Sequence, residues 1–279
     1  MNIIKRKEVL AKEIKLIEVE APLIASQVKP GQFVVLRIDE KGERIPLTVA
    51  NKNRQKGTIT IIFQEVGAST KLLGTLKEGD SILNLLGPLG QPTHIEKFGN
   101  VVVIGGGVGI AEIYPIIRAF REAGNKVISI IGARCKELLI LDKLIAKESD
   151  EIHITTDDGS CGRKGFVSDV LKEMIESERE IDLVYAVGPV LMMEAVTKIT
   201  KPHNIKTLVS LNPIMLDATG MCGVCRVVVG GKTLFACVDG PEFDGHLVDF
   251  EELKSRLEMY KDKEKVALAR VEHEYKLNK

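Results

Sequence analysis

The feature that most constrains the fold is a change in the spacing of apolar residues near residue 98. Before it, short alternating runs such as EIKLIEVEA and TITIIFQEV are separated by turn residues, which is typical of antiparallel strands. After it, apolar strands such as NVVVIGGG alternate with helical stretches such as AEIYPIIRAFREAG. The sequence therefore predicts an antiparallel β-barrel followed by a parallel α/β sheet of the kind that binds nucleotides.

The C-terminal part of the chain follows neither pattern. From about residue 213 to 248 it is rich in glycine and cysteine, with two short strands joined through Gly230-Gly231, a plausible hairpin turn. This segment is too small to bury a core of its own, so it needs a metal or a neighbour. The residues after Phe250 are charged and helix-rich. We predict four parts: a barrel over 1–97, an α/β domain over 98–212, a small module over 213–250 and a helical tail over 251–279.

Charge and length exclude several classes of protein. The chain has 279 residues, and its 39 basic and 39 acidic residues cancel without a long run of like charge, so we expect no nucleic-acid partner. It has no stretch of about 18 apolar residues and no apolar signal-peptide core at its charged start, so we expect neither membrane insertion nor secretion. The predicted location is the cytoplasm, where clustered cysteines indicate a metal rather than disulfides.

A cluster of metal-binding residue types lies in the small module. Asp217, Cys222, Cys225 and Cys237 form the pattern D-x4-C-x2-C-x11-C. Plant-type [2Fe-2S] sites use C-x4-C-x2-C and a later cysteine, so this pattern keeps their spacing with a carboxylate in the first position. Structural zinc with three cysteines and one oxygen ligand is an alternative, and Asp217 alone could be a helix cap or a surface carboxylate.

A glycine-rich turn begins the second part of the chain. Gly105, Gly106, Gly107 and Gly109 follow the strand NVVVI and open a helix, as a dinucleotide-binding loop does. Small residues there let a pyrophosphate approach the backbone N–H groups of the helix N-terminus. Ile110 occupies the last position of the strict G-x-G-x-x-G pattern, and tight packing of strand against helix is the alternative explanation for the glycines.

Charged residues after the next two strands bear on the choice of nucleotide. Arg134 follows one strand and could suit the 2′-phosphate of NADP. Asp157 and Asp158 follow the next strand and would repel that phosphate if they lie beside the ribose, although they could instead cap a turn. We favour NAD(H) as the ligand.

Several motifs together resemble the ferredoxin-NADP reductase superfamily over residues 1 to about 212. They are Arg44 with Pro46-Leu47-Thr48, the segment from Gly67 through Ser69 to Thr70, Leu86-Gly-Pro-Leu-Gly90, the Gly105 loop and Gly188-Pro189. The resemblance implies FAD in the barrel, with Arg44 and the Gly67–Thr70 segment at the pyrophosphate and Thr48 near flavin N5. Leu47 replaces the aromatic residue of the family motif, so no residue is assigned to aromatic stacking on the flavin ring.

With the cysteine pattern included, the whole chain resembles the small subunits of NADH-dependent ferredoxin:NADP oxidoreductases and is similar to dihydroorotate dehydrogenase electron-transfer subunits. The resemblance implies FAD, NAD(H) and a [2Fe-2S] cluster held by three cysteines and Asp217, whereas the dihydroorotate branch resembles four-cysteine ligation. It also implies a heterodimer with a larger flavin and [4Fe-4S] subunit that reduces NADP and ferredoxin by electron bifurcation.

The expected activity is that of an oxidoreductase subunit without an acid–base triad. Hydride passes between NAD(H) and FAD, and single electrons then pass through the cluster, which requires stacking and exclusion of water more than a proton-transferring pair. Cys161 could approach the nicotinamide, but a buried structural thiol is the alternative. A subunit of dihydroorotate dehydrogenase and a zinc-stapled nucleotide-binding regulator are the competing hypotheses.

Overall fold

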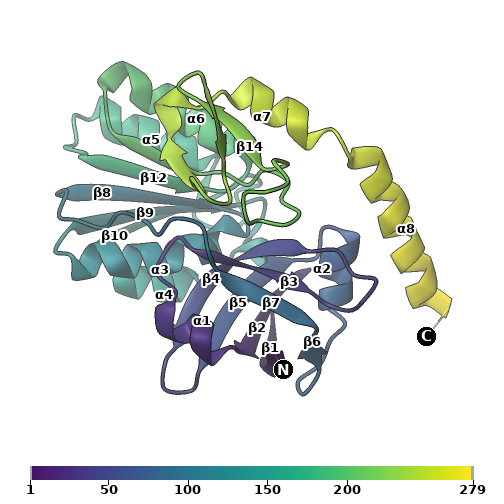
Figure 1. Cartoon of the computed structure of the whole chain (residues 1–279). Coiled ribbons are helices and arrows are strands. Elements are labelled where there is room, and N and C mark those ends of the chain that lie inside the picture. Colours follow the sequence, from purple (N-terminus) through teal and green to yellow (C-terminus); the bar gives the residue numbers. More distant parts are fainter. Residues whose placement is uncertain (1, 278–279) are drawn as a thin grey trace.

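The computed structural model describes residues 2–277, arranged as two seven-stranded sheets with a hairpin and two helices following them (Figure 1). Met1 of the predicted barrel and residues 278–279 of the predicted tail lie outside the described residues. The predicted fold class, an antiparallel barrel with a parallel α/β domain, a small module and a helical tail, is confirmed.

The first sheet is antiparallel and curls into a nearly closed barrel. Its strands are β1 (Asn2–Ala11), β2 (Ile14–Glu20), β3 (Phe33–Arg37), β4 (Ile45–Asn53), β5 (Thr58–Gln64), β6 (Ser81–Ile82) and β7 (Asn84–Leu89), in the order β6-β1-β2-β5-β4-β3-β7. Leu83 alone separates the two edge strands β6 and β7 along the chain, so the edges of the sheet lie close together. Short helices α1 (Pro22–Gln27) and α2 (Ala68–Leu73) flank the barrel.

Alternation of side chains explains why these segments form a barrel. Ile17 and Val19 of β2 and Ile59 and Ile61 of β5 are fully buried, and the residues between them face outward or are only partly buried. Successive side chains of a strand point to opposite faces, so one face of each strand fills the interior. The buried face forms a core of its own that includes Val34, Leu36 and Phe63.

The second sheet is parallel except at one edge. Its strands are β8 (Asn100–Gly106), β9 (Lys126–Ala133), β10 (Glu151–Thr156), β11 (Arg163–Lys164), β12 (Leu183–Val187), β13 (Thr207–Ser210) and β16 (Glu242–Asp244), in the order β11-β10-β9-β8-β12-β13-β16. From β8 the chain builds outward through β9 and β10, then returns to place β12 on the other side of β8. The carboxyl ends of β8 and β12 therefore form the switch point where such sheets bind ligands.

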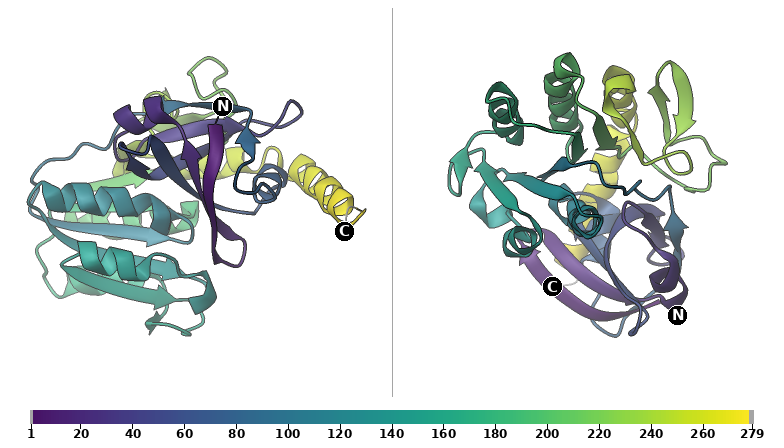
Figure 2. Two further views of the ribbon diagram at one scale, coloured as in Figure 1. Left: turned by 90° about the horizontal axis from the view of Figure 1, so that it is seen from below. Right: turned by 90° about the vertical axis from the view of Figure 1, so that its left-hand side faces the viewer.

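Helices cover both faces of this sheet (Figures 1 and 2). On one face lie α3 (Gly109–Glu122) and α4 (Asp142–Glu148), and on the other α5 (Val167–Glu176) and α6 (Val190–Thr200). The buried residues of α3 recur every three or four positions, from Ile110 and Ile113 to Ile117 and Phe120, which is the stripe of an amphipathic helix. Short 3₁₀ turns lie at Lys136–Leu138, Lys201–His203 and Gly245–Leu247.

The C-terminal segment packs on the parallel sheet. The predicted hairpin is confirmed: β14 (Arg226–Val229) and β15 (Lys232–Phe235) pair through Gly230 and Gly231, whose φ angles of 59° and 74° suit a tight hairpin turn. Val227 and Ala236 share a core with α5, α6 and the parallel sheet. Helix α7 (Phe250–Leu257) follows, and α8 (Lys261–Leu277) reaches back to contact α2 (Figure 1).

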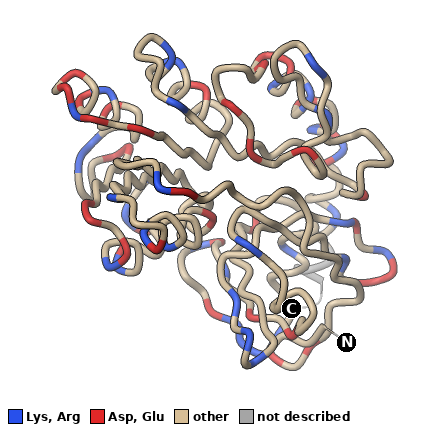
Figure 3. Tube along the Cα trace, turned by 60° about the vertical axis from the view of Figure 1, so that its left-hand side comes forward, with Lys and Arg blue, Asp and Glu red and all other residues tan. Residues whose placement is uncertain are grey.

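Charged residues of both signs are interspersed along the chain, as the coloured trace in Figure 3 shows. No helix within residues 2–277 combines the length and apolarity that crossing a bilayer requires.

Candidate functional site

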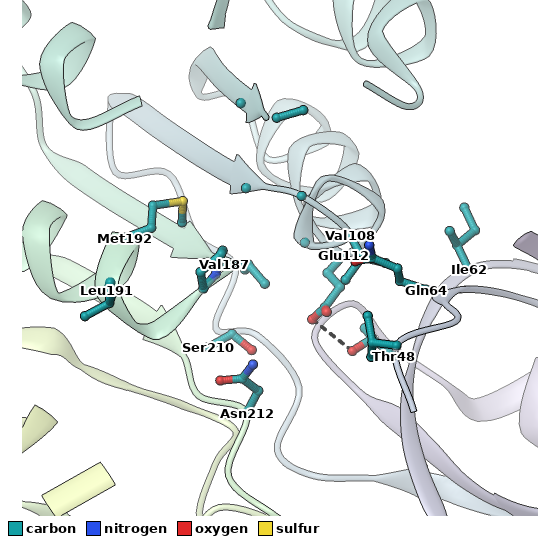
Figure 4. Close-up of a pocket in the computed structure, with 18 of the residues that line it drawn as sticks. Thr48, Ile62, Gln64, Val108, Glu112, Val187, Leu191, Met192, Ser210 and Asn212 are labelled. Atoms are coloured by element: carbon teal, nitrogen blue, oxygen red, sulfur yellow. Dashed lines mark hydrogen bonds between the residues drawn. The ribbon is translucent and has the colours of Figure 1, made fainter. Parts of the chain in front are cut away.

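A cavity of ≈ 970 Å³ lies between the barrel and the carboxyl ends of the parallel strands. Strands β4 and β5 form one wall, and the loops after β8, β9, β12 and β13 form the other, so side chains of both domains face the same space (Figure 4). Its lining is mostly apolar with a few polar groups, which is the usual character of a cofactor site.

Most of the predicted binding residues meet at this cavity. Those that line it are Pro46, Leu47, Thr48, Thr70, Gly106, Gly107, Gly109, Arg134, Asp157, Gly188 and Pro189. Those outside its lining are Arg44, Gly67, Ser69, Gly105 and Asp158. Arg44 is exposed just before β4, one residue from the strand that carries Thr48.

The glycine loop between β8 and α3 serves both packing and access. A Cβ atom on Gly109 would lie 2.6 Å from the carbonyl oxygen of Val187, and one on Gly105 would lie 3.0 Å from the Cα atom of Ile110. These two glycines therefore let strands and helix pack closely. Gly107 has a φ of 59° and open space beside it, and it lines the cavity. Tight packing therefore explains Gly105 and Gly109, whereas the backbone at Gly107 is open to the cavity.

Two loops that lie side by side form the outer end of the cavity. The backbone N–H of Asp157 donates to the carbonyl of Ala133 at 3.1 Å, which places Asp157 next to the loop of Arg134. Asp158 turns away, because its Oδ1 accepts hydrogen bonds from the hydroxyl (2.6 Å) and backbone N–H (2.9 Å) of Ser160. These bonds lower the pKa of Asp158. One aspartate faces the cavity, and the other caps a turn.

Sequence reasoning missed a carboxyl group on the inner wall. Glu112 in the first turn of α3 lines the cavity, and its Oε2 accepts a hydrogen bond of 2.9 Å from the Thr48 hydroxyl (Figure 4). Loss of hydration raises the pKa of Glu112 to about 7, and the bond from Thr48 only partly opposes this. The sequence does contain a signal for this group: an acidic residue stands three positions after Gly109, at a helix start where an anionic ligand would approach.

Other lining residues also went unpredicted. Ser210 ends β13 and Asn212 follows it, across the cavity from Thr48 and Glu112 (Figure 4). Gln64 at the end of β5 adds another polar group, and Met192 of α6 adds an apolar one. All but Met192 stand at or just past the end of a strand, a signal for a polar residue at a ligand site. Cys161 is not part of the lining, and its backbone N–H donates to the Thr156 hydroxyl.

The four predicted metal ligands lie together as two pairs. The thiol of Cys222 lies 3.2 Å from Oδ1 of Asp217, and the thiols of Cys225 and Cys237 lie 3.2 Å apart. The first pair is accessible and the second is buried. Within residues 2–277, no three His, Cys, Asp or Glu side chains are placed to hold a single metal ion. Two donor pairs fit a cluster with two irons, each of which takes two protein ligands.

The loop that carries these ligands is shaped by residues with positive φ. Gly220 and Gly223 have φ angles of 85° and 67°, as expected if the loop curls around a cluster. Ala218 has a φ of 58°, which is strained for a residue with a Cβ atom. The loop continues directly from the cavity wall, since Pro213 and Met215 line the cavity just before Asp217.

The ionisation of the donors differs between the pairs. The backbone N–H of Thr219 is the main cause that lowers the pKa of Asp217. Burial, and then the hydrogen bond with Cys225, raises the pKa of Cys237 to about 12. A thiol with so high a pKa becomes a thiolate only when a metal supplies positive charge. The outer pair therefore offers an anionic oxygen at neutral pH, whereas the Cys237 thiol would need the charge of a bound metal to ionise.

Comparison with family models divides the chain in the same way as its fold. Residues 103–198 match an oxidoreductase NAD-binding domain. Residues 212–249 match the iron-sulfur cluster binding domain of dihydroorotate dehydrogenase B, and this range includes all four predicted ligands.

Whole-chain relatives extend these matches. A Thermotoga maritima homolog of the dihydroorotate dehydrogenase B (NAD(+)) electron transfer subunit is 46% identical over 97% of this chain and 95% of its own. A probable subunit of the same kind from Methanocaldococcus jannaschii is 36% identical over 88% of this chain and 92% of its own.

Two solved structures are similar to this chain over most of its length. A chain from the structure of an NADH-dependent reduced ferredoxin-NADP oxidoreductase, described for flavin-based electron bifurcation, superposes with a TM-score of 0.92 at 45% identity. Each chain is covered to 97%. Phthalate dioxygenase reductase superposes with a TM-score of 0.59 at 17% identity over 82% of this chain and 85% of its own, which shows a shared fold.

Proposed function

Because the chain belongs to the family of dihydroorotate dehydrogenase B electron transfer subunits and their homologues, we propose that it is the small subunit of an NADH-dependent reduced ferredoxin:NADP oxidoreductase. It is an oxidoreductase subunit that uses NAD(H) and FAD and holds an iron–sulfur cluster. The observation that carries the proposal is that one loop joins the cavity wall to both donor pairs, which gives electrons a short route from the cavity to the cluster.

The cavity has room for a flavin and a nicotinamide between its two walls. We assign the flavin to the barrel side, with Pro46, Leu47 and Thr48 against it, and with Arg44, Gly67, Ser69 and Thr70 toward its pyrophosphate. The nucleotide belongs to the sheet side, where the N-terminus of α3 has no side-chain cap and, with the glycine loop before it, can face a phosphate. FAD supplies the chemistry that accepts a hydride and releases single electrons.

The donor set favours a [2Fe-2S] cluster held by Asp217, Cys222, Cys225 and Cys237. Two pairs of donors suit two irons, whereas the zinc alternative needs donors that converge on one ion. Asp217 also favours the ferredoxin:NADP branch over the four-cysteine dihydroorotate branch.

The partner is a larger subunit, and we propose that it carries flavin and [4Fe-4S] clusters and reduces NADP and ferredoxin by electron bifurcation. The accessible donor pair, with Asp217 partly buried and Cys222 exposed, gives the cluster an outward-facing side for this exchange. We keep 1–97, 98–212, 213–250 and 251–279 as the proposed boundaries of the flavin, nucleotide, cluster and tail regions.

The proposed function predicts the properties of the purified chain. It should contain FAD together with iron and acid-labile sulfide, and NADH should bleach the flavin absorption under anaerobic conditions. Absorption spectra with and without NADH, together with iron and zinc analysis, test this. A colourless protein, or one containing zinc in place of iron, would contradict it.

The two aspartates after β10 predict different effects on nucleotide choice. Asp157→Asn should improve the use of NADPH relative to NADH by about tenfold, because a like charge facing the ribose end of the cavity is removed. Asp158→Asn is the matched control and should leave the preference unchanged, since that carboxylate is bound to Ser160. Anaerobic titration of flavin reduction with each nucleotide measures the ratio, and equal ratios in all three proteins would refute this placement of Asp157.

A further inference from the structure

Glu112 stands apart from the other charged residues of the cavity. Among the described residues, the charged side chains of its lining are Arg134, Asp157 and Glu112. Arg134 and Asp157 are exposed at the outer end. Glu112 is partly buried on the inner wall, and its carboxylate accepts a hydrogen bond from Thr48 of β4, in the opposite domain.

The proposed reaction leaves a proton that needs an acceptor. A hydride carries two electrons and a proton to one flavin atom, N5. The electrons then leave singly to the iron–sulfur cluster, which a one-electron acceptor in the partner subunit reoxidises, while the proton stays on N5. For each hydride that arrives, one N–H bond at N5 breaks, and its proton goes to a base.

Resting on the proposed function, we propose that Glu112 is the base that receives this proton, through the hydroxyl of Thr48. The Thr48 hydroxyl donates its own hydrogen to Oε2 of Glu112, so the lone pairs of its oxygen are free to accept from a group in the cavity. As the N5 proton moves onto the Thr48 oxygen, the hydroxyl proton moves onto the carboxylate. The partly accessible carboxyl group then returns the proton to water.

The pKa of Glu112 is set by loss of hydration and by the hydrogen bond from Thr48, with no contribution from a neighbouring charge. Helix α3 packs against β4, β8, β9, β12 and α4. From β12 the buried phenol of Tyr185 faces it, and burial, then Glu242, and then Glu112 raise the pKa of Tyr185. In β4, Lys52 is bonded to the carbonyl of Val28, and β8 contains no titratable residue. No charged group of β9 or α4 contributes to the shift of Glu112.

The ionisation of Glu112 gives the proposal a pH dependence. With a pKa raised to about 7, the carboxyl group is protonated below that pH and cannot accept a proton, and above it the carboxylate can. Loss of electrons from the reduced flavin should therefore slow as the pH falls through about 7. If Glu112 did not take part in proton transfer, the rate of electron loss would show no such change near pH 7.

The test compares variants of the FAD-loaded, cluster-containing chain. The flavin is reduced with one equivalent of NADH and reoxidised with excess ferricyanide, a one-electron oxidant, in a stopped-flow instrument between about pH 5.5 and 8.5. Glu112→Gln should slow reoxidation about 100-fold at the alkaline end, the size of a general-base contribution, and flatten the profile. Thr48→Val should do the same, whereas Thr48→Ser should retain the step. Glu242→Gln is the control, because Glu242 is a partly buried carboxyl group outside the cavity lining, and it should keep the profile.

A second readout does not depend on the flavin. The infrared difference spectrum between the flavin-free protein and its Glu112→Gln variant should contain a protonated-carboxyl band that disappears as the pH rises through about 7. The inference is overturned if that band does not titrate there, or if the Glu112→Gln profile retains the step. If Glu112→Gln does not load FAD, the Thr48→Val and Thr48→Ser pair decides. An unchanged protein that binds no FAD, or is not reduced by NADH, counts instead against the proposed function.

Discussion

Cys225→Ala is expected to yield a protein that binds FAD and is bleached by NADH but holds no iron–sulfur cluster. Cys225 and Cys237 form the buried donor pair, 3.2 Å apart. Without Cys225, one iron keeps a single protein ligand, and the remaining thiol is buried and reluctant to ionise. Three donors that remain in two places cannot hold two irons.

The loss should be complete for the cluster and slight for the fold. Replacing a small buried thiol with a methyl group costs about 1 kcal/mol in a core that otherwise stays intact. Iron and sulfide analysis, with the flavin spectrum before and after NADH, separates the two effects. Cys161→Ala is the matched control, because Cys161 lies in the loop after β10, outside both pairs, and should leave the iron content unchanged. A full iron content in Cys225→Ala would exclude this residue as a ligand.

Gly109→Ala is expected to destabilise the nucleotide domain more than Gly107→Ala. The new methyl group would meet the carbonyl oxygen of Val187 at 2.6 Å and the Cα atom of Gly188 at 3.1 Å. Both are backbone atoms that cannot rotate away, so the free energy of unfolding should fall by about 3 kcal/mol. The forced shift also displaces Gly188 and Pro189, which line the cavity, and NADH should bind more weakly.

Gly107→Ala is the matched control for Gly109→Ala. Its φ of 59° makes alanine strained by about 1 kcal/mol, but no atom lies within 4 Å of the added methyl group. Denaturant unfolding of the FAD-loaded chain, with NADH titration, measures both variants. A smaller loss of stability for Gly109→Ala than for Gly107→Ala would contradict the packing role of Gly109.

The fold could be predicted because its signals are local. The period of apolar residues distinguishes β2 and β5 from α3 and α5, and the glycines after β8 mark the start of a helix. The spacing of the cysteines likewise predicted that Asp217, Cys222 and Cys225 lie in one loop before β14. It did not show that Cys237, after β15, pairs with Cys225, because the hairpin fold brings those two thiols together.

The rest of the site depends on contacts between distant segments. Glu112 and Thr48 are 64 residues apart, and only the packing of α3 on the barrel makes their hydrogen bond. Asp157 and Asp158 are adjacent and of one type, yet a single turn directs one to the cavity and the other to Ser160. No periodic pattern encodes such directions, because they depend on the tertiary fold.

The edge strand β16 has a consequence for how this chain can diversify. The backbone N–H of Leu211 donates to the carbonyl of Pro241 at 2.9 Å, and Ser210 and Glu242 are partners across β13 and β16. The segment 211–241 therefore leaves and re-enters the sheet at neighbouring points, so in topological terms it is one long insertion in a β-hairpin. Insertions whose ends lie close together can change in length and content while the scaffold is retained. The segment that carries the predicted cluster ligands can thus be replaced during evolution, while the cavity between the barrel and the parallel strands is retained.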